Sequence, residues 1–275
     1  MNYLQMRFPD FRRKAVTLSY DDVTTHNKKL VEILNRYGLK CTFNFNGGFL
    51  GRPGYLTADE TVALLKNSPH EIAVHGFRHY SLGLVDSAAA VNDIIEDRKT
   101  LEKLFGRVVK GMAYANGVCD DKVVEMLKQC GISYARTTDS TGRFEMTDDW
   151  LKMPATCHHK NPNLMGLAKQ FVEEKEQGYF WARCPMLFYL WGHAHEFAND
   201  DNWHVLEEFA KCVGGREEIW YATNGEIYDY AKAFERLEFS VDGKYVYNPS
   251  ARDVFFIALD GKYVCVKAGE RKEIE

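Results

Sequence analysis

Carboxylates and imidazoles follow three apolar segments of this 275-residue chain. In pairs they are Asp21 and Asp22 after AVTLSY, His75 and His79 in HGFRH, and His193 and His195 in GHAHEF. Two imidazoles and one carboxylate can hold a catalytic divalent metal and leave positions open for water and substrate. The metal lowers the pKa of a water, and a nearby carboxylate can take its proton. The residue types therefore predict metal-dependent hydrolysis.

The two adjacent carboxylates need different partners, because neighbours in an extended segment point to opposite faces. We assign Asp22 to the metal together with His75 and His79, and Asp21 to the base. Zn²⁺ suits this ligand set, which would also accommodate Co²⁺, Fe²⁺ or Mn²⁺. The alternative is a solvated turn between a strand and a helix, where aspartate serves only as a cap.

The hydrophobic pattern predicts the elements that position these residues. Segments with helical periodicity separate the apolar runs that predict strands, which span 14–20, 41–46, 71–75, 108–114, 132–137, 185–192 and 218–223. Thr57 and Thr223 are expected helix N-caps. The alternation predicts an α/β fold, a distorted (β/α) barrel of about seven parallel strands over residues 1–237. Active sites of such barrels lie at the C-terminal strand ends, so the three pairs should share one rim.

The pattern changes after Leu237. Residues 238–275 contain β-rich runs broken by two Asp-Gly turns, at Asp242 and Asp260. We expect a small β-rich appendage that packs on the barrel.

Composition narrows the possible partners and the compartment. The net charge of −4 comes without a basic block, so nothing favours nucleic acid. Apolar runs stay short of membrane-spanning length, and the N-terminus lacks the apolar stretch of a secretory signal. The seven cysteines include no CxxC pair and are expected to be reduced thiols of a cytoplasmic protein, unless a signal was removed. The oligomeric state is not predicted.

Two motifs resemble those of the polysaccharide deacetylases, the NodB-homology class that forms carbohydrate esterase family four. Ser19-Tyr20-Asp21-Asp22 looks like their Thr-Phe-Asp-Asp motif, whose first Asp is the base and whose second is a metal ligand. HGFRH looks like their His-Ser/Thr-x-x-His motif, which supplies both metal imidazoles, with Gly76 at the hydroxyl position. The resemblance covers roughly residues 14–237 and implies these same roles here.

The resemblance also implies a general acid after a Leu-containing strand. His193 directly follows Gly192 at the strand end, as the motif requires, and is favoured over His195, which would line the pocket. A rival metal cluster is Cys157-His158-His159. Consecutive ligands do not all converge on one ion without help, so we expect these residues to line the cleft.

The third motif departs from the family. The usual Arg, which braces the catalytic Asp, is replaced by Ala113 in GMAYANG. The N–H of Asn116 could still stabilise an oxyanion, because a main-chain donor needs no particular side chain. Tyr114 is a further substrate-binding candidate, and Trp150 of TDDW is expected to form an aromatic wall of the pocket.

Together these observations predict a metal-dependent deacetylase of N-acetyl or O-acetyl groups on a carbohydrate. One alternative keeps the chemistry and changes the substrate to small non-sugar amides, as in the allantoinase-like branch. The other is a catalytically inactive barrel that binds glycans, which the missing Arg would explain.

Overall fold

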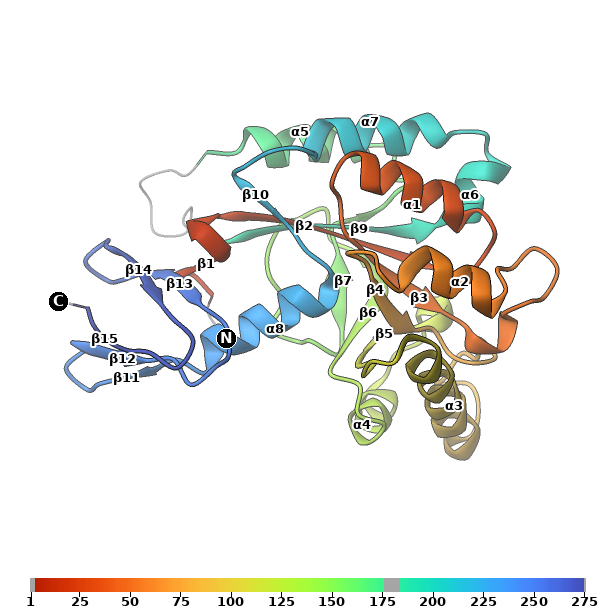
Figure 1. Ribbon diagram of the computed structural model, residues 1–275, viewed down its shortest axis with the longest axis horizontal. Coiled ribbons are helices and arrows are strands. Elements are labelled where there is room, and N and C mark those ends of the chain that lie inside the picture. The colour runs from red at the N-terminus through yellow and green to blue at the C-terminus, as the bar shows by residue number, and fades with distance from the viewer. Residues whose placement is uncertain (1–2, 176–183, 275) are drawn as a thin grey trace.

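A parallel sheet that curls into a nearly closed barrel dominates the structure, a computed structural model that describes residues 3–175 and 184–274 (Figure 1). Its strands are β2 Lys14–Asp21, β3 Cys41–Phe45, β4 Glu71–Val74, β5 Gly111–Ala113, β6 Tyr134–Ser140, β7 Met153–Ala155, β8 Cys157–His158 and β9 Met186–His193. They are ordered β7, β6, β5, β4, β3, β2, β9, β8. Only Thr156 separates the two end strands of this order, so residues 153–158 close the barrel. The predicted fold class is confirmed.

One further parallel strand, β10 (Ile219–Tyr221), distorts the barrel. Strand β2 pairs with β9 along its whole length, from Lys14 to Asp21. Its other edge is shared: β10 pairs with Lys14 to Val16 and β3 with Leu18 to Asp21. With β10, which corresponds to the predicted strand 218–223, the sheet has nine strands, two more than the seven that the sequence pattern predicts; the additions are β7 and β8.

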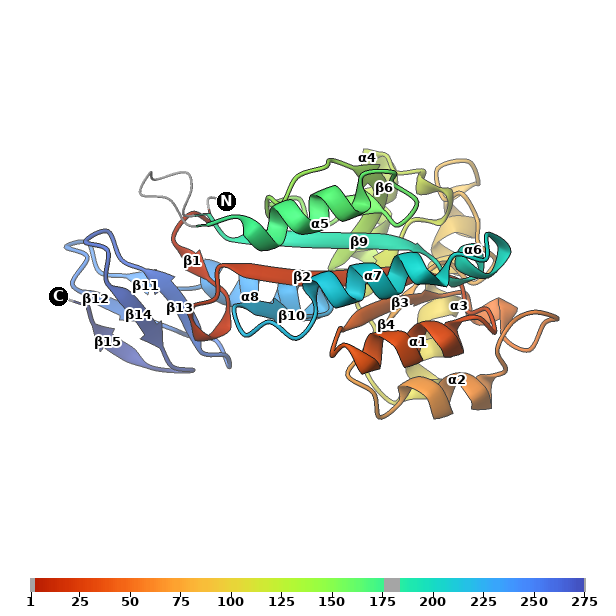
Figure 2. The ribbon, with the colours of Figure 1, turned by 90° about the horizontal axis from the view of Figure 1, so that it is seen from above.

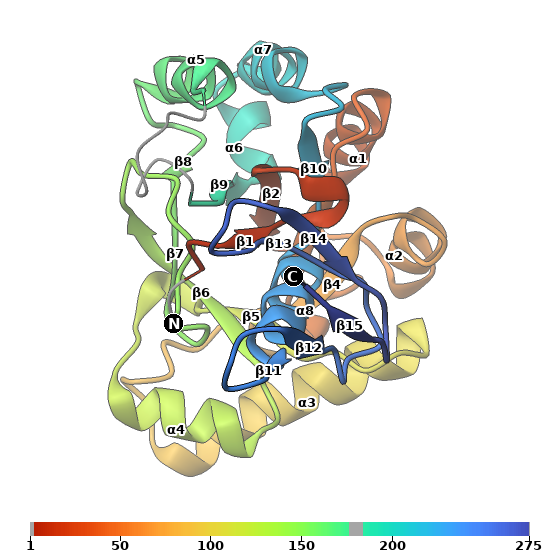
Figure 3. The same cartoon turned by 90° about the vertical axis from the view of Figure 1, so that its left-hand side faces the viewer.

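Helices surround the barrel, and the hydrophobic core lies between helices and strands (Figure 3). They are α1 Asn27–Arg36, α2 Ala58–Leu65, α3 Ser87–Phe105, α4 Asp121–Gln129, α5 Leu164–Glu173 and α7 Trp203–Val213. On β2, Val16, Leu18 and Tyr20 belong to this core. Their neighbours Ser19 and Asp21 must point into the barrel, because side chains alternate along a strand. The inner face of β2 is consequently polar at its carboxyl end, whereas Ala15 at its amino end belongs to a second hydrophobic cluster with Leu187 and Tyr189 of β9.

The remaining helices and three 3₁₀ turns complete the described fold, and two of the helices begin with well-formed N-caps. The remaining helices are α6 Ala194–Asn199 and α8 Asn224–Glu235, with 3₁₀ turns η1 Pro9–Phe11, η2 Gly47–Phe49 and η3 Ala115–Gly117. Thr57 and Thr223 are helix N-caps, as expected, and each forms a capping box, with Glu60 and Glu226 respectively. These reciprocal hydrogen bonds satisfy backbone N–H groups that a helix start leaves free.

The first turn of α8 is tied to the amino ends of the strands by Glu71. This carboxylate accepts hydrogen bonds from the Thr42 hydroxyl (2.7 Å) and the Gly225 N–H (2.9 Å), and it contacts the Tyr134 hydroxyl. Burial raises the pKa of Glu71 from 4.5 to about 6, although the donors partly oppose this effect.

We predict that Glu71→Gln removes part of the pH dependence of stability. Because the folded-state pKa is the higher one, the stabilisation by protonated Glu71 is complete below pH 4.5 and lost as pH rises through about 6. The difference corresponds to at most about 2 kcal/mol. Glutamine mimics the protonated form, accepting from Thr42 and Gly225 and donating to Tyr134. Urea unfolding at pH 5 and at pH 7.5 should therefore show a smaller difference in the variant. Identical pH dependence in both proteins would contradict this prediction.

Two small antiparallel sheets form the appendage at one end of the barrel (Figure 2). One contains β1 Met6–Arg7, β13 Val254–Ile257 and β14 Tyr263–Val266, and the other β11 Glu238–Phe239, β12 Tyr245–Tyr247 and β15 Arg271–Glu273. Because β1 pairs with β13, both ends of the chain contribute to the first sheet. Strands β2 and β9 run away from the appendage, so their carboxyl ends lie at the opposite end of the molecule.

Strands β7 and β8 and helix α5 are among the elements that were not expected from the sequence. Strands β7 and β8 span only three and two residues, too few to display a period of two. Helix α5 ends shortly before residues 176–183, which the structure does not describe. The seven cysteines all lie within the described residues and are free thiols, as expected. Among those same residues, no helix combines the length and the hydropathy needed to span a membrane.

Candidate active site

Three polar side chains from neighbouring strands meet at the carboxyl end of β2. Asp21 has Asn44 of β3 and His193 of β9 as its register partners. Register partners point to the same side of a sheet, so all three side chains enter the barrel. Asn44 Nδ2 donates to Asp21 Oδ1 (2.8 Å), and His193 Nε2 lies 3.9 Å from Asp21 Oδ2. The Asp21 carboxylate is 2% exposed.

A break in backbone conformation turns Asp22 toward the same rim. Its φ of +64° lies in the left-handed region, which is uncommon for residues other than glycine and clusters at functional sites. Because of this φ, the side chain of Asp22 does not continue the alternation of side chains along β2. Asp22 Oδ2 thereby lies 3.9 Å from His195 Nδ1, and a side-chain oxygen of Asp22 approaches His75 and His79.

The geometry around Asp22, His75 and His79 fits a divalent metal. Their ligand atoms all lie within 4.8 Å of one another. His75 Nδ1 is 2.9 Å from the Ala113 carbonyl, which only accepts, so this nitrogen carries the proton. The lone pair of Nε2 is then available for a metal, and such an outer hydrogen bond is typical of metal-bound histidines. His79 also adopts a left-handed backbone, with φ +60°.

Two buried carboxylates of α3 hold the HGFRH loop. Asp97 accepts hydrogen bonds from the His75 N–H (3.0 Å) and the Gly47 N–H (2.5 Å), and Asp93 accepts from the Arg78 N–H (2.8 Å). Gly76 has φ +85°, and a Cβ there would lie 2.6 Å from Asp93 Oδ2. The carboxylate of Asp93 therefore explains why glycine replaces the hydroxyl residue of the family motif.

Arg136 braces Asp21, although the motif comparison finds alanine at the usual Arg position. Ala113 of β5 and Arg136 of β6 are register partners, so the arginine has moved one strand along the barrel. Its guanidinium donates to Asp21 Oδ2 and, through Nε, to Ser19 Oγ at 3.3 Å. It also lies 4.3 Å from the centre of the Trp191 ring. The motif comparison leaves open what orients Asp21, and Arg136 supplies that contact.

These charges decide the ionisation of Asp21. Burial alone would raise its pKa, but Arg136, with help from His75 and His193, lowers the pKa to about 2. Asp21 is therefore a carboxylate throughout the physiological pH range and can accept a proton.

Two predicted substrate contacts, Trp150 and Tyr114, have side chains that pack in the core. Trp150 is 5% exposed and packs against Tyr3 and Tyr228, and its indole N–H donates to the Tyr3 hydroxyl. The Tyr114 side chain is 1% exposed and donates to the Leu151 carbonyl. Both aromatic rings are more stable in the core, where their polar tips find partners. The aromatic ring at the site is Trp191, which the sequence analysis assigned only to a strand.

The remaining candidates lie at the rim. Asn116 has φ +58° in η3, and its side chain donates to Ser81 Oγ (2.9 Å). The hydrogen bond joins η3 to the loop that carries His75 and His79. The ring of His195 lies 5.2 Å from that of His193. His193 faces Asp21 and His195 faces Asp22.

The rival cluster also lies at this rim, joined by a residue that the sequence analysis missed. His158, His159 and Glu196 place ligand atoms within 4.8 Å of one another. However, His158 Nδ1 accepts the Lys160 N–H (3.1 Å), so its Nε2 carries the proton and donates to Glu196 (3.2 Å). A protonated nitrogen does not bind a metal. The geometry favours a hydrogen-bonded cluster at the cleft over a second metal centre.

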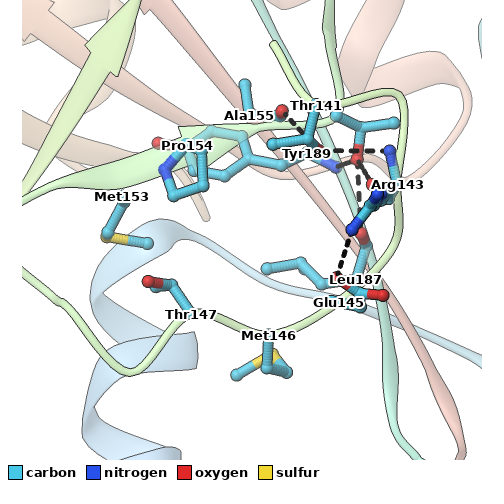
Figure 4. Close-up of a pocket in the computed structure, with 11 residues that line it drawn as sticks. Thr141, Arg143, Glu145, Met146, Thr147, Met153, Pro154, Ala155, Leu187 and Tyr189 are labelled. Carbon is cyan, nitrogen blue, oxygen red and sulfur yellow. Dashed lines mark hydrogen bonds and ion pairs between the residues drawn. The ribbon is translucent and has the colours of Figure 1, made fainter. Parts of the chain in front are cut away.

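A small cavity lies apart from these residues (Figure 4). It measures about 120 Å³ and is lined by Thr141, Arg143, Met153, Leu187 and Tyr189, among others. Leu187 and Tyr189 precede His193 on β9, so the cavity lies nearer the amino ends of the strands. It contains none of the predicted site residues.

Comparisons with known proteins give a family whose model matches part of the chain. Residues 9–135 match the model of the polysaccharide deacetylase family. The predicted resemblance to this family is confirmed. No curated protein gives a significant sequence match.

Solved structures share the barrel at low sequence identity. A polysaccharide deacetylase-like structure from Mycobacterium smegmatis aligns with 84% of this chain and 94% of its own, at 15% identity and a TM-score of 0.60. A family 4 carbohydrate esterase from Streptomyces lividans aligns over 76% and 92%, at 13% identity and a TM-score of 0.52. A carbohydrate esterase family pseudoenzyme from Bacillus anthracis aligns over 82% and 68%, at 13% identity and a TM-score of 0.51. The chain spans about half the length of two other deacetylases, 55% and 44%.

We predict that Asp22→Ala or His79→Ala removes the metal. Each variant leaves two of the three ligands, too few for tight binding. Metal analysis after dialysis should fall from one ion per chain to a small fraction, and activity should fall with it. His204→Ala, which removes an exposed histidine of α7, is the matched control and should retain the ion. Full metal content in either ligand variant would refute the ligand assignment.

Proposed function

We propose that the protein is a metal-dependent deacetylase that hydrolyses N-acetyl or O-acetyl groups of a carbohydrate. One observation carries the proposal: an ionised, braced carboxylate, Asp21, lies beside a set of three metal ligands and faces an imidazole, His193, 3.9 Å away. A base, an acid and a metal centre are the groups that amide hydrolysis requires.

Each residue has a defined task in this proposal. A divalent cation held by Asp22, His75 and His79 would polarise the acetyl carbonyl and lower the pKa of water. Asp21 accepts a proton from the attacking water, and Arg136 with Asn44 fixes its two oxygens. The Asn116 N–H is proposed to stabilise the developing oxyanion.

His193 is proposed as the general acid in preference to His195. Its Nε2 lies 3.9 Å from Asp21 Oδ2, so a substrate amide bound beside this pair would be within reach of both base and acid. Burial opposes its charged form, but Glu196, Asp21 and Asp22 raise the pKa of His193 above its ordinary value. The imidazolium is therefore available to protonate a departing amine.

Acetate release tests the proposal. The Zn²⁺- or Co²⁺-reconstituted protein would be offered N-acetylglucosamine oligomers, the monosaccharide and acetylated xylan, with Asp21→Asn as control. We expect release that disappears in the control. No release from any sugar by a protein with one bound metal per chain would instead favour small non-sugar amides. An inactive glycan-binding barrel would bind oligomers and release no acetate from any substrate; the brace on Asp21 argues against it, since binding alone needs no oriented base.

A further inference from the structure

Glu196 gathers histidines of two elements around one oxygen. It lies at the third position of α6, and its Oε2 accepts the backbone N–H of His193 at 3.2 Å. The same oxygen lies 3.0 Å from His193 Nδ1, 3.2 Å from His158 Nε2 and 3.4 Å from His159 Nε2. The His193 N–H, His193 Nδ1 and His158 Nε2 donate to this oxygen, whereas neither ring nitrogen of His159 has a hydrogen-bond partner among the described residues. These three donors exceed what a capping box needs, which is a single reciprocal pair.

The charge of Glu196 fixes which nitrogen of His193 carries a proton. Although burial opposes ionisation, hydrogen bonds from His158 and His193 hold the pKa of Glu196 well below its ordinary value. An ionised carboxylate only accepts hydrogen bonds, so His193 Nδ1 must be an N–H. The other nitrogen, Nε2, is left toward Asp21. The pair thus defines both the orientation and the tautomer of the proposed general acid.

His158 in turn aligns Glu196. Its Nδ1 accepts the Lys160 N–H, which forces the proton onto Nε2 and makes this nitrogen a donor to Glu196. The His158 ring also packs edge-on against Trp191, with centroids 4.4 Å apart. Two contacts therefore fix the ring that supports the carboxylate.

We propose that Glu196, aligned by His158, is the positioning residue of the general acid His193. The inference rests on the proposed function. In the step that it serves, the C–N bond of the tetrahedral intermediate breaks and its electron pair goes to nitrogen. That nitrogen takes the proton from His193 Nε2, so free amine and acetic acid result, and the acetic acid releases its proton to solvent as acetate. The proton that Asp21 took from water then restores His193, while Glu196 stays ionised throughout.

The leaving group separates this role from a purely structural one. An amine is a poor leaving group that needs a proton, whereas para-nitrophenolate departs without one. We expect Glu196→Gln to lower kcat for deacetylation of an N-acetylglucosamine oligomer by about 10²-fold, as for loss of a general acid. Hydrolysis of para-nitrophenyl acetate should stay within about threefold of the wild type. His193→Gln should show the same pattern, and Glu196→Asp, which keeps the charge, an intermediate one.

Matched controls complete the experiment. Glu208→Gln makes the same chemical change at an exposed position of α7, and it should change neither rate more than about threefold. Metal content should remain one ion per chain in Glu196→Gln. A second ion in the wild type that this variant loses would overturn the inference in favour of a metal site.

The remaining outcomes are also decisive. Equal losses on the amide and on the aryl ester would mean that Glu196 only maintains the structure. Unchanged amide hydrolysis in Glu196→Gln would overturn the inference while the proposed function stands. A wild-type protein that hydrolyses neither acetyl compound would overturn the proposed function, and the inference with it.

Discussion

Exchanging Asp21 for asparagine should leave the metal in place and reduce turnover by about 10²- to 10⁴-fold, the usual contribution of a general base. The amide has nearly the same shape as the carboxylate but does not accept a proton from water. Asp21 is not one of the three grouped ligands, so its replacement should spare the metal. Metal analysis and acetate release on the same preparation measure both results.

The neighbouring position supplies a matched control. Asp22→Asn makes the same chemical change one residue further on, where we expect loss of the metal itself. Near-normal rates in Asp21→Asn would show that another group is the base. Because the variant leaves Arg136 without its anion, its unfolding temperature should be measured first, so that rates are compared for folded protein.

The sequence predicts the barrel well because several independent signals agree. Apolar runs, helical periodicity and two capping boxes all indicate the same alternation of strands and helices. The rim follows from one rule of topology: parallel strands end together, so charged pairs at three strand ends meet. The two motifs place Asp21 and His75 at this rim, because Asp21 is the last residue of β2 and His75 directly follows β4.

The role of Arg136 does not follow from the third motif, because that motif covers a single strand and Arg136 lies on the neighbouring one. An arginine inside an apolar parallel strand is itself a signal, since a buried charge requires a partner. The run ISYART displays this signal. What the sequence does not display is register, and only the pairing of Ala113 with Arg136 reveals that the cation occupies the neighbouring strand.

At Trp150 and Asp22 the sequence pattern does not predict where the side chain lies. TDDW resembles a pocket motif, but local sequence does not say which end of the barrel a loop reaches, and Trp150 packs beside Tyr3 and Tyr228. For Asp22, strand alternation predicts opposite faces for the two carboxylates. The left-handed φ of Asp22 overrides that rule, and residue type alone does not predict such a conformation.

Arg136→Met should be among the most destabilising single substitutions in the barrel. Arg136 is 1% exposed and Asp21 2%, so removing the cation leaves a buried, unpaired carboxylate. Breaking such a pair typically costs about 3–5 kcal/mol, which would lower the unfolding temperature by roughly 10 °C in a protein of this size. Thermal unfolding followed by circular dichroism measures this change.

The same substitution should also move the pH profile. Without Arg136, burial is less opposed, so the pKa of Asp21 rises from about 2 and the base becomes protonated at higher pH. The acid limb of kcat/KM should therefore shift toward neutrality. Arg136→Lys keeps a charge but not the planar pair of donors, and it should fall between the wild type and Arg136→Met.

A double-mutant cycle tests whether Asp21 is the reason for the arginine. In Asp21→Asn with Arg136→Met, neither charge remains, so the loss of stability should be smaller than the sum of the two single losses. Additive losses, or wild-type stability and pH profile in Arg136→Met, would mean that the guanidinium does not brace the base. The position of Arg136 opposite Ala113 would then be a feature of packing rather than a replacement for the family's arginine.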